Sequence, residues 1–249
     1  MSLEHIKHYI RSVELQQNQI PNFHDYPFNL SAVRNLSSLK FHPKVTFFVG
    51  ENGTGKSTIL EAIATAYGFN PEGGTKNFNF SSMNTHSQLY HYIKLIKGVN
   101  MPKDGFFLRA ESFYNVATNI DELDKDEGGP PIINSYGGIS LHKQSHGESF
   151  LSLLINKFMG KGIYILDEPE AALSPTRQMT MISRIHELVQ QDSQFIIATH
   201  SPIIMAYPDC IIYEIKEGFN KVKYEETEHY QVTKAFLNST QKMLNILIK

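Results

Sequence analysis

Residues 45–66 decide the fold, and they read Val45-Thr-Phe-Phe-Val-Gly50-Glu-Asn-Gly-Thr-Gly-Lys-Ser-Thr58-Ile-Leu-Glu-Ala-Ile-Ala-Thr-Ala66. A short run of β-branched and aromatic residues leads through a glycine-rich turn into a helix-forming segment, which predicts a strand, a loop and a helix in succession. The turn satisfies the pattern G-x-x-x-x-G-K-[ST] from Gly50 to Ser57. Such glycines let backbone N–H groups curl around a phosphate, and the N-terminus of the following helix adds positive potential. We therefore expect a phosphate-binding loop here.

The side chains at the end of this loop have separate expected roles. Lys56 is expected to contact the terminal phosphates of a nucleotide, and the hydroxyl of Ser57 is expected to bind Mg²⁺. The residues expected to bind the nucleotide are Gly50, Glu51, Asn52, Gly53, Thr54, Gly55, Lys56, Ser57 and Thr58.

The same strand-and-loop pattern returns in the second half of the chain. Residues 162–166 form a short apolar run that ends in Asp167 and Glu168, and residues 194–199 form another that ends in His200. Runs of this length without polar alternation are typical of strands buried on both faces. Between them, Ser174-Pro175 gives a helix start signal, with serine as N-cap and proline at the first helical position. Strands that alternate with helices predict a parallel α/β sheet, whose ligands gather at the carboxyl ends of the strands.

Polar side chains at these strand ends suit phosphoryl hydrolysis. That reaction needs one carboxylate to hold Mg²⁺ and a second group to orient and activate the attacking water. We assign the metal to Asp167 and the water to Glu168. A neutral imidazole at His200 can donate to a γ-phosphate oxygen and accept from the water, so His200 is the second candidate catalytic residue.

Residues 145–149, Ser-His-Gly-Glu-Ser, open an apolar helical run from Phe150 to Phe158. A serine followed three residues later by glutamate is an ordinary capping box. The alternative is a second helix N-terminus that presents Ser145 and the Gly147 amide to a phosphate, including one held by another subunit. Both interpretations are kept at this point.

The middle and the end of the chain carry weaker signals. Paired glycines and an acidic stretch interrupt residues 68–144, which we interpret as an inserted helical or irregular subdomain. Within it, residues 106–110 predict a further strand leading to Glu111, and residues 112–123 a helix. The C-terminal part is predicted to form a β-hairpin from residues 211–215 and 222–225, followed by helical material over 229–248.

Composition limits the class of protein. A chain of 249 residues with 41% hydrophobic and 19% charged residues has the size and composition of one large globular domain. A net charge of -2 gives no global electrostatic attraction to nucleic acid or membrane, although a local basic patch is compatible with it. The single cysteine, Cys210, allows no disulfide within the chain, which indicates a reducing, cytoplasmic environment. The residues show neither a leader pattern nor an apolar run of about 18 residues, so we expect no direct membrane insertion.

Taken in order, the motifs at residues 50–58, 145–149, 166–175 and 199–202 resemble those of the ATP-binding-cassette (ABC) ATPases. They match Walker A, the signature, Walker B with the D-loop, and the switch histidine. The sequences Gly-Glu-Asn-Gly, Asp-Glu-Pro-Glu and Thr-His-Ser-Pro make the chain look less like a transporter subunit than like the soluble branch that includes the RecF, SMC and Rad50 ATPases. Stand-alone bacterial "predicted ATPase" proteins also belong to that branch.

The resemblance implies a single domain over residues 1–249: an α/β P-loop NTPase head with a mainly parallel sheet and an inserted helical subdomain. It also implies that the chain binds and hydrolyses MgATP as a homodimer that sandwiches ATP. Two departures stand out. The signature, typically Leu-Ser-Gly-Gly-Gln, keeps the serine and one glycine but replaces the other glycine and the glutamine. The Q-loop glutamine has no clear match. Glu111, a further candidate metal ligand, occupies a comparable place after the strand over residues 106–110, and Gln88 is the alternative.

Several functions share these motifs. The favoured one is a soluble ATP-driven switch for DNA repair or phage defence, with nucleic acid or an effector protein as partner. The alternative is the nucleotide-binding subunit of an ABC transporter. A small-molecule kinase would also use the loop, but Glu168 and His200 favour water as the phosphoryl acceptor.

Overall fold

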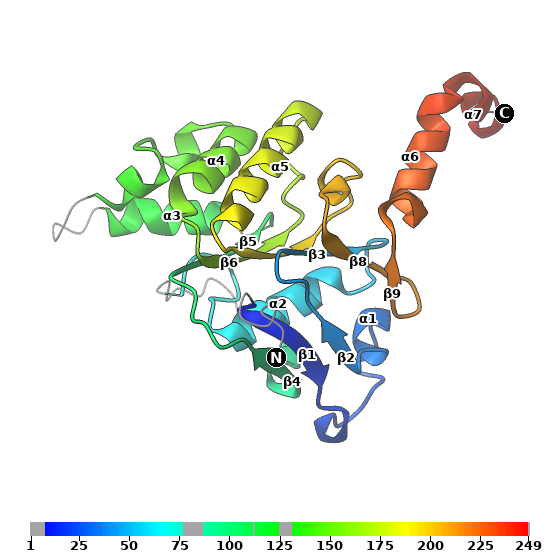
Figure 1. Ribbon diagram of the computed structural model, residues 1–249, viewed down its shortest axis with the longest axis horizontal. Helices are drawn as coiled ribbons and strands as arrows, with labels where there is room; N and C mark the ends of the chain where they lie inside the picture. The colour runs from blue at the N-terminus through cyan, green and yellow to red at the C-terminus, as the bar shows by residue number, and fades with distance from the viewer. Residues whose placement is uncertain (1–7, 77–86, 112, 125–130, 249) are drawn as a thin grey trace.

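The computed structural model describes residues 8–76, 87–111, 113–124 and 131–248 (Figure 1). These residues form an α/β fold with a six-stranded sheet and a smaller three-stranded sheet. The strand order of the large sheet is β5 (Asp104–Arg109), β6 (Gly162–Asp167), β7 (Gln194–Ala198), β3 (Val45–Val49), β8 (Cys210–Ile215) and β9 (Phe219–Val222). Every neighbouring pair in it is parallel except β8 and β9, which are antiparallel. The predicted mainly parallel sheet is confirmed.

The central strands are buried on both faces, as the unbroken apolar runs predict. Every residue of β3, β6 and β7 is buried. Because side chains alternate across a strand, neighbouring residues enter different cores. Phe47 packs in the core on one face, and Phe48 packs in the core on the other.

Helices cover one face of the large sheet, and a mixed layer covers the other (Figure 1). The first layer contains α3 (Phe113–Leu123), α4 (His146–Ser152) and α5 (Pro175–Gln190), whose apolar side chains share a core with Phe47. The second contains α1 (Ser31–Arg34), α2 (Lys56–Tyr67) and the small antiparallel sheet. The strand order of that sheet is β2 (Ser38–Lys40), β1 (Ile10–Leu15) and β4 (Ile93–Lys97). Helix α2 therefore packs against the large sheet, whose strand β3 leads through the glycine-rich loop into this helix.

Short turns complete the described chain. The 3₁₀ turns span Gln17–Gln19, Gln88–Tyr92, Ile132–Tyr136, Leu141–Lys143, Ile204–Ala206 and Tyr224–Glu226. A π turn, Leu153–Lys157, continues α4, so the predicted apolar helix over residues 150–158 is divided between two helix types.

Residues 68–144 are distributed over three places in the fold. Strand β4 joins the small sheet, β5 forms an edge of the large sheet, and α3 with two 3₁₀ turns packs beside α4. Of this stretch, residues 77–86, 112 and 125–130 lie outside the described residues.

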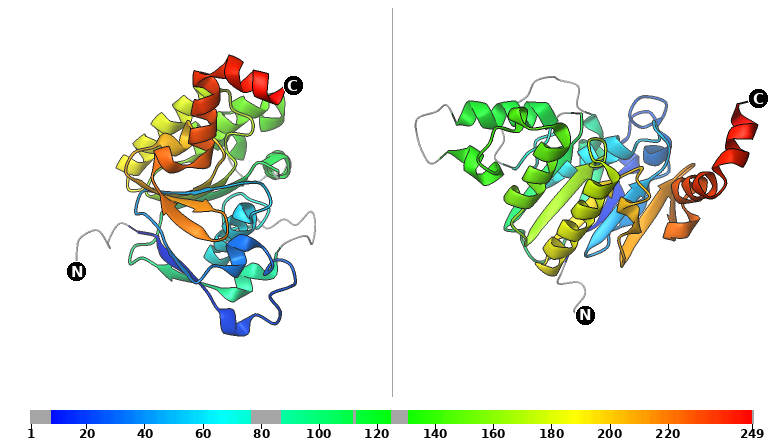
Figure 2. Two further views of the ribbon diagram at one scale, coloured as in Figure 1. Left: turned by 90° about the vertical axis from the view of Figure 1, so that its right-hand side faces the viewer. Right: turned by 90° about the horizontal axis from the view of Figure 1, so that it is seen from above.

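The C-terminal hairpin forms, but its second strand was predicted in the wrong place. Strand β9 begins at Phe219, directly after the turn, whereas residues 224–226 form a 3₁₀ turn. The tight turn, closed by the Lys216 N–H donating to the Gly218 carbonyl at 3.2 Å, explains this early start. The helical tail is α6 (Glu228–Asn238) and α7 (Thr240–Leu247), separated at Ser239, whose φ of -144° is not helical. Both helices extend away from the sheets (Figure 2).

Candidate active site

The phosphate-binding loop joins the end of β3 to the start of α2, and its glycines adopt conformations that other residues rarely reach. Gly50, Gly53 and Gly55 have φ of 142°, 80° and 101°. A Cβ at Gly50 would lie 2.5 Å from the carbonyl oxygen of Ile215, so no larger residue fits there. The loop is therefore a preformed cradle of backbone amides at a helix N-terminus.

Lys56 points back into this cradle. Its Nζ donates to the carbonyl oxygens of Gly50 at 2.7 Å and Glu51 at 2.9 Å, and the residue is only 3% exposed. Burial lowers the pKa of Lys56, while Glu168 and Asp167 oppose that shift. The ammonium thus lies within the loop that is expected to surround a phosphate.

Ser57 and Asp167 meet across two elements. The Ser57 hydroxyl donates to Oδ1 of Asp167 at 3.1 Å, which joins the start of α2 to the end of β6. Burial raises the pKa of Asp167 to about 7, although the Ser57 hydrogen bond and the charge of Arg109 work in the opposite direction.

A hydroxyl and a carboxylate are oxygen ligands that suit Mg²⁺, which is usually held by one or two carboxylates together with substrate phosphates. Among the described residues no group of three or more His, Cys, Asp or Glu side chains could hold a metal ion. Ser57 and Asp167 fit a Mg²⁺ ion that completes its coordination with nucleotide and water.

Glu168 and His200 approach each other from neighbouring strands. Glu168 has a φ of 50°, and its amide donates to the Ala198 carbonyl at 3.0 Å, so the chain turns sharply after β6. Its Oε1 lies 3.3 Å from Nε2 of His200, which follows β7. Burial and the nearby Lys56 charge lower the pKa of His200, which favours the neutral imidazole at neutral pH. The pair can therefore orient and deprotonate a water molecule.

One pocket joins these residues to parts of the chain that carry no motif. It is lined by Tyr26, Leu30, Asn52, Gly53, Gly55, Lys56, Ser57, Thr58 and Glu168. The Ala32 amide donates to the Thr54 carbonyl at 3.1 Å, which fixes the Tyr26 segment beside the loop. Tyr26, which is 63% exposed, offers an aromatic face at this pocket. Sequence reasoning missed Tyr26 and Leu30, because no spacing pattern links them to the loop.

The remaining loop positions support the pocket without lining it. Glu51 contributes its carbonyl, which accepts from Lys56 and from the Thr54 hydroxyl at 2.9 Å, and Gly50 provides the close approach to β8.

Glu111 forms an ion pair with Arg109, whereas the other two candidate metal ligands, Ser57 and Asp167, contact each other. It follows β5 with an exposed side chain, and its Oε2 lies 3.2 Å from Nη2 of Arg109. The same guanidinium makes a 2.7 Å ion pair with the buried Glu61. Glu111 influences Asp167 only through its charge, which raises the pKa of that carboxyl. Gln88, the other Q-loop candidate, lies in the 3₁₀ turn before β4, outside the pocket lining.

Ser145 and Gly147 lie at the start of α4, outside the pocket lining. The Ser145 hydroxyl and amide both donate to Oε2 of Glu148, at 2.6 Å and 3.0 Å, which satisfies the capping-box interpretation. Gly147 packs closely against the D-loop, since a Cβ there would lie 2.6 Å from the Ala172 carbonyl oxygen. The Ser145 side chain is exposed.

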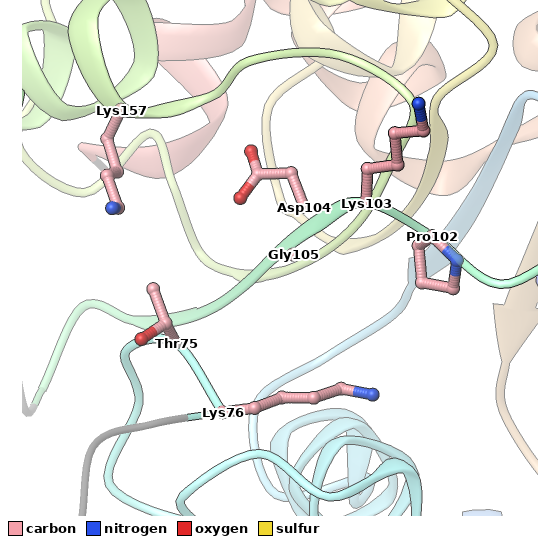
Figure 3. Close-up of a pocket in the computed structure, with 7 residues that line it drawn as sticks. All are labelled: Thr75, Lys76, Pro102, Lys103, Asp104, Gly105 and Lys157. Atoms are coloured by element: carbon pink, nitrogen blue, oxygen red, sulfur yellow. The ribbon is translucent and has the colours of Figure 1, made fainter.

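A second pocket lies at the opposite end of β5 and is lined by Thr75, Lys76, Pro102, Lys103, Asp104, Gly105 and Lys157 (Figure 3). Three of its four charged side chains, those of Lys76, Asp104 and Lys157, have structural partners. The Lys76 ammonium lies 4.1 Å from the Tyr67 ring centroid, and Lys157 lies 5.3 Å from that of Tyr136. Oδ2 of Asp104 accepts from the Tyr164 hydroxyl at 2.7 Å. This pocket is separate from the nucleotide site, because the P-loop lies at the carboxyl ends of the strands.

Comparison with known proteins agrees with this architecture. The ATP-binding cassette MJ1267 of an ABC transporter superposes with a TM-score of 0.53 at 18% identity, covering 92% of this chain and 96% of that one. The fold is therefore that of an ABC-type P-loop ATPase. A family model described as "AAA domain" matches residues 19–231, and the chain belongs to that family.

Two curated relatives match shorter stretches. "ABC transporter G family member STR2" of Medicago truncatula is 23% identical over 172 residues, or 64% of this chain and 24% of that protein. "DNA replication and repair protein RecF" of Colwellia psychrerythraea is 59% identical over 32 residues, or 12% of this chain and 8% of that protein. The chain thus spans a quarter or less of either relative. Together with the fold, these matches are consistent with an ABC-type ATPase of the RecF and SMC branch.

Within the described residues, no helix combines the length and the apolar character that crossing a membrane requires.

Proposed function

We propose that this protein binds MgATP and hydrolyses it. The observation that carries the proposal is the meeting of five side chains at one edge of the sheet. Lys56 and Ser57 begin α2, Asp167 ends β6 and Glu168 comes directly after it, and His200 follows β7. The contacts between Ser57 and Asp167 and between Glu168 and His200 support metal and water chemistry beside the phosphate cradle.

In the proposed reaction, the loop amides and Lys56 bind the β- and γ-phosphates and stabilise charge that develops during transfer. Ser57 and Asp167 would hold Mg²⁺, which would neutralise phosphate charge when bound. Glu168 accepts the proton of the attacking water, and His200 orients the water and donates to the γ-phosphate. We expect the exposed ring of Tyr26, which lines the same pocket, to pack against the adenine ring of ATP.

We further propose that two copies close around two ATP molecules. Ser145 and the Gly147 amide lie away from the pocket of their own chain, while Ser145 is exposed at a helix N-terminus. In a two-fold dimer the same residues would reach the γ-phosphate held by the partner. ATP would then drive closure, because the second phosphate contact exists only in the dimer.

The variant Glu168→Gln tests both steps. The amide keeps the size of the side chain but cannot accept a proton, so MgATP should bind normally while hydrolysis slows by about 10²- to 10⁴-fold. Sedimentation with and without ATP then reports whether the trapped state is a dimer. Wild-type turnover in this variant would refute the role of Glu168, and persistent monomer with bound ATP would refute closure.

Mixing two inactive variants gives a sharper test of the shared site. A dimer of one Lys56→Ala chain and one Ser145→Arg chain contains one site with both lesions and one with neither. Recovered ATPase activity on mixing supports the shared site, and its absence leaves Ser145 as a helix cap.

The process that ATP drives is proposed to be a cytoplasmic switch, with nucleic acid or an effector protein as partner. The short match to RecF supports a DNA-linked role, which stimulation of the ATPase by DNA would test. The match to a transporter of the G family favours the alternative, a transporter subunit, which stable association with a membrane-spanning partner would support.

A further inference from the structure

The switch histidine has an imidazole neighbour that no sequence motif includes. His229, in the first turn of α6, places its Nε2 3.0 Å from Nδ1 of His200. The two rings come from segments 29 residues apart, and their centroids are separated by 5.1 Å.

The base of α6 is firmly attached to the sheet, so this contact is not a chance approach of a loose tail. The Glu228 amide donates to Oε1 of the buried Glu214 on β8 at 2.8 Å. The ammonium of Lys216 also lies between the Glu214 and Glu228 carboxylates, at 3.3 Å and 3.2 Å. The N-cap, Thr227, is fully buried and its hydroxyl donates to the Tyr224 carbonyl at 2.8 Å. His229 is therefore held in place although most of α6 is exposed.

Two facing ring nitrogens can share only one hydrogen between them. If His200 donated from Nδ1, its neutral ring would present a lone pair at Nε2 to the Glu168 carboxylate, 3.3 Å away. His229 would then also need a proton on Nδ1, which is buried and has no hydrogen-bond partner among the described residues. If His229 donates from Nε2 instead, His200 carries its hydrogen on Nε2 and directs it toward Glu168. Nε2 of His200 is itself buried and makes no hydrogen bond of good geometry among the described residues. A hydrogen on it nevertheless lies near a carboxylate oxygen 3.3 Å away, whereas a hydrogen on Nδ1 of His229 has no hydrogen-bond partner among those residues. The second arrangement is therefore favoured, because it replaces a lone-pair repulsion with an attraction.

We propose that His229 is a positioning residue that fixes the tautomer and the ring orientation of His200 by donating a hydrogen bond to its Nδ1. A histidine ring acts through one nitrogen according to the hydrogen bond that the other nitrogen makes. With Nδ1 occupied, the Nε2–H of His200 points into the site, where the proposed function requires a donor to the γ-phosphate. This inference rests on the proposed function for its catalytic consequence, but the hydrogen bond itself does not depend on ATP.

The first experiment is a long-range ¹H–¹⁵N correlation spectrum of the histidine rings in the full chain without nucleotide, with His200 assigned from a His200→Gln variant. The expected result is His200 in the Nε2–H tautomer in the wild type and a mixture of tautomers in His229→Phe. A wild-type His200 that carries its proton on Nδ1 would overturn the proposal. This readout stands whether or not the protein hydrolyses ATP, so failure of the proposed function is seen separately as absence of turnover.

The second experiment measures kcat and KM for MgATP. His229→Phe should lower kcat about 10-fold or more with little change in KM, since outer hydrogen bonds of this kind typically contribute 10- to 100-fold. His229→Gln places an amide N–H near the ring Nε2 position and should restore most of kcat. Val232→Ala, at an exposed position of the same helix, is the matched control and should behave as wild type. Wild-type kcat in the Phe variant, or equal losses in the Phe and Gln variants, would overturn the role of the donated hydrogen bond.

Discussion

The substitution Asp167→Asn separates two effects of the buried carboxylate, namely the loss of folding stability that it causes and its contribution to MgATP binding. Asp167 is 5% exposed, and burial raises its pKa from 3.8 to about 7. A carboxyl whose folded pKa lies above its unfolded value keeps a proton in the folded state that the unfolded chain has already lost. The free energy of unfolding therefore falls as the pH rises from about 4 to about 7, and the loss is complete above pH 7.

The magnitude follows from the two pKa values. A difference of about 3 between them, at about 1.4 kcal/mol for each pH unit, amounts to about 4 kcal/mol of destabilisation at pH 8. Asparagine carries no charge, so Asp167→Asn should recover up to about 4 kcal/mol in protein free of nucleotide and metal. The gain should shrink as the pH falls and should disappear near pH 4. Arg109 stays paired with Glu61 and Glu111 in the variant, so no cation is left unpaired.

Urea unfolding in EDTA at pH 5 and pH 8 measures this effect. Glu168→Gln is the matched control, because Glu168 is the adjacent carboxylate but its side chain is 38% exposed. Glu168→Gln should change the free energy of unfolding much less than Asp167→Asn does. MgATP should then stabilise the wild type more than Asp167→Asn, since only the carboxylate can neutralise the metal. An Asp167→Asn variant no more stable than wild type at pH 8 would refute the reasoning.

Two further substitutions probe the cradle and the signature. Lys56→Ala removes charge-assisted contacts to phosphate, so ATP binding should weaken by about 3 kcal/mol, or roughly 100-fold. Isothermal calorimetry measures this loss, and an unchanged affinity would contradict the assignment of the phosphate-binding loop. Glu148→Gln should strengthen ATP-dependent dimerisation in sedimentation experiments made in the Glu168→Gln background, and weaker dimerisation would show that the carboxylate itself is needed.

The parts of the fold that the sequence predicts are those that depend on local pattern. Strands β3, β6 and β7 appear as apolar runs because each is buried on both faces, and the loop glycines are recognisable because Gly50 approaches the Ile215 backbone. The N-cap of α5 at Ser174, which accepts from the Arg177 amide, is equally local. Such features need no knowledge of distant residues.

Contacts between distant segments carry no comparable signal. The small sheet contains β1, β2 and β4, and β4 pairs with β1 although the two strands are far apart in the sequence. No local pattern in the sequence indicates this pairing. Gln194 lies inside an apolar run, yet its side chain accepts from the Tyr9 and Ile10 amides at 3.0 Å and 2.9 Å and so links the two sheets. Tyr26 and His229 were missed for the same reason. Their place in the site follows from packing across the whole chain.

The altered signature can be interpreted from the contacts of Glu148. This residue takes the place of the signature glutamine, and its carboxylate accepts from both the hydroxyl and the amide of Ser145. In the proposed dimer, Ser145 would reach a phosphate of the partner only after its hydroxyl leaves that carboxylate, and the negative charge would also repel the phosphate. Arg177, 3.3 Å from Glu148, offsets part of the charge and is placed to draw the carboxylate aside. In Glu148→Gln the repulsion disappears and the Ser145 hydroxyl loses a charged acceptor, so closure around ATP should require less free energy.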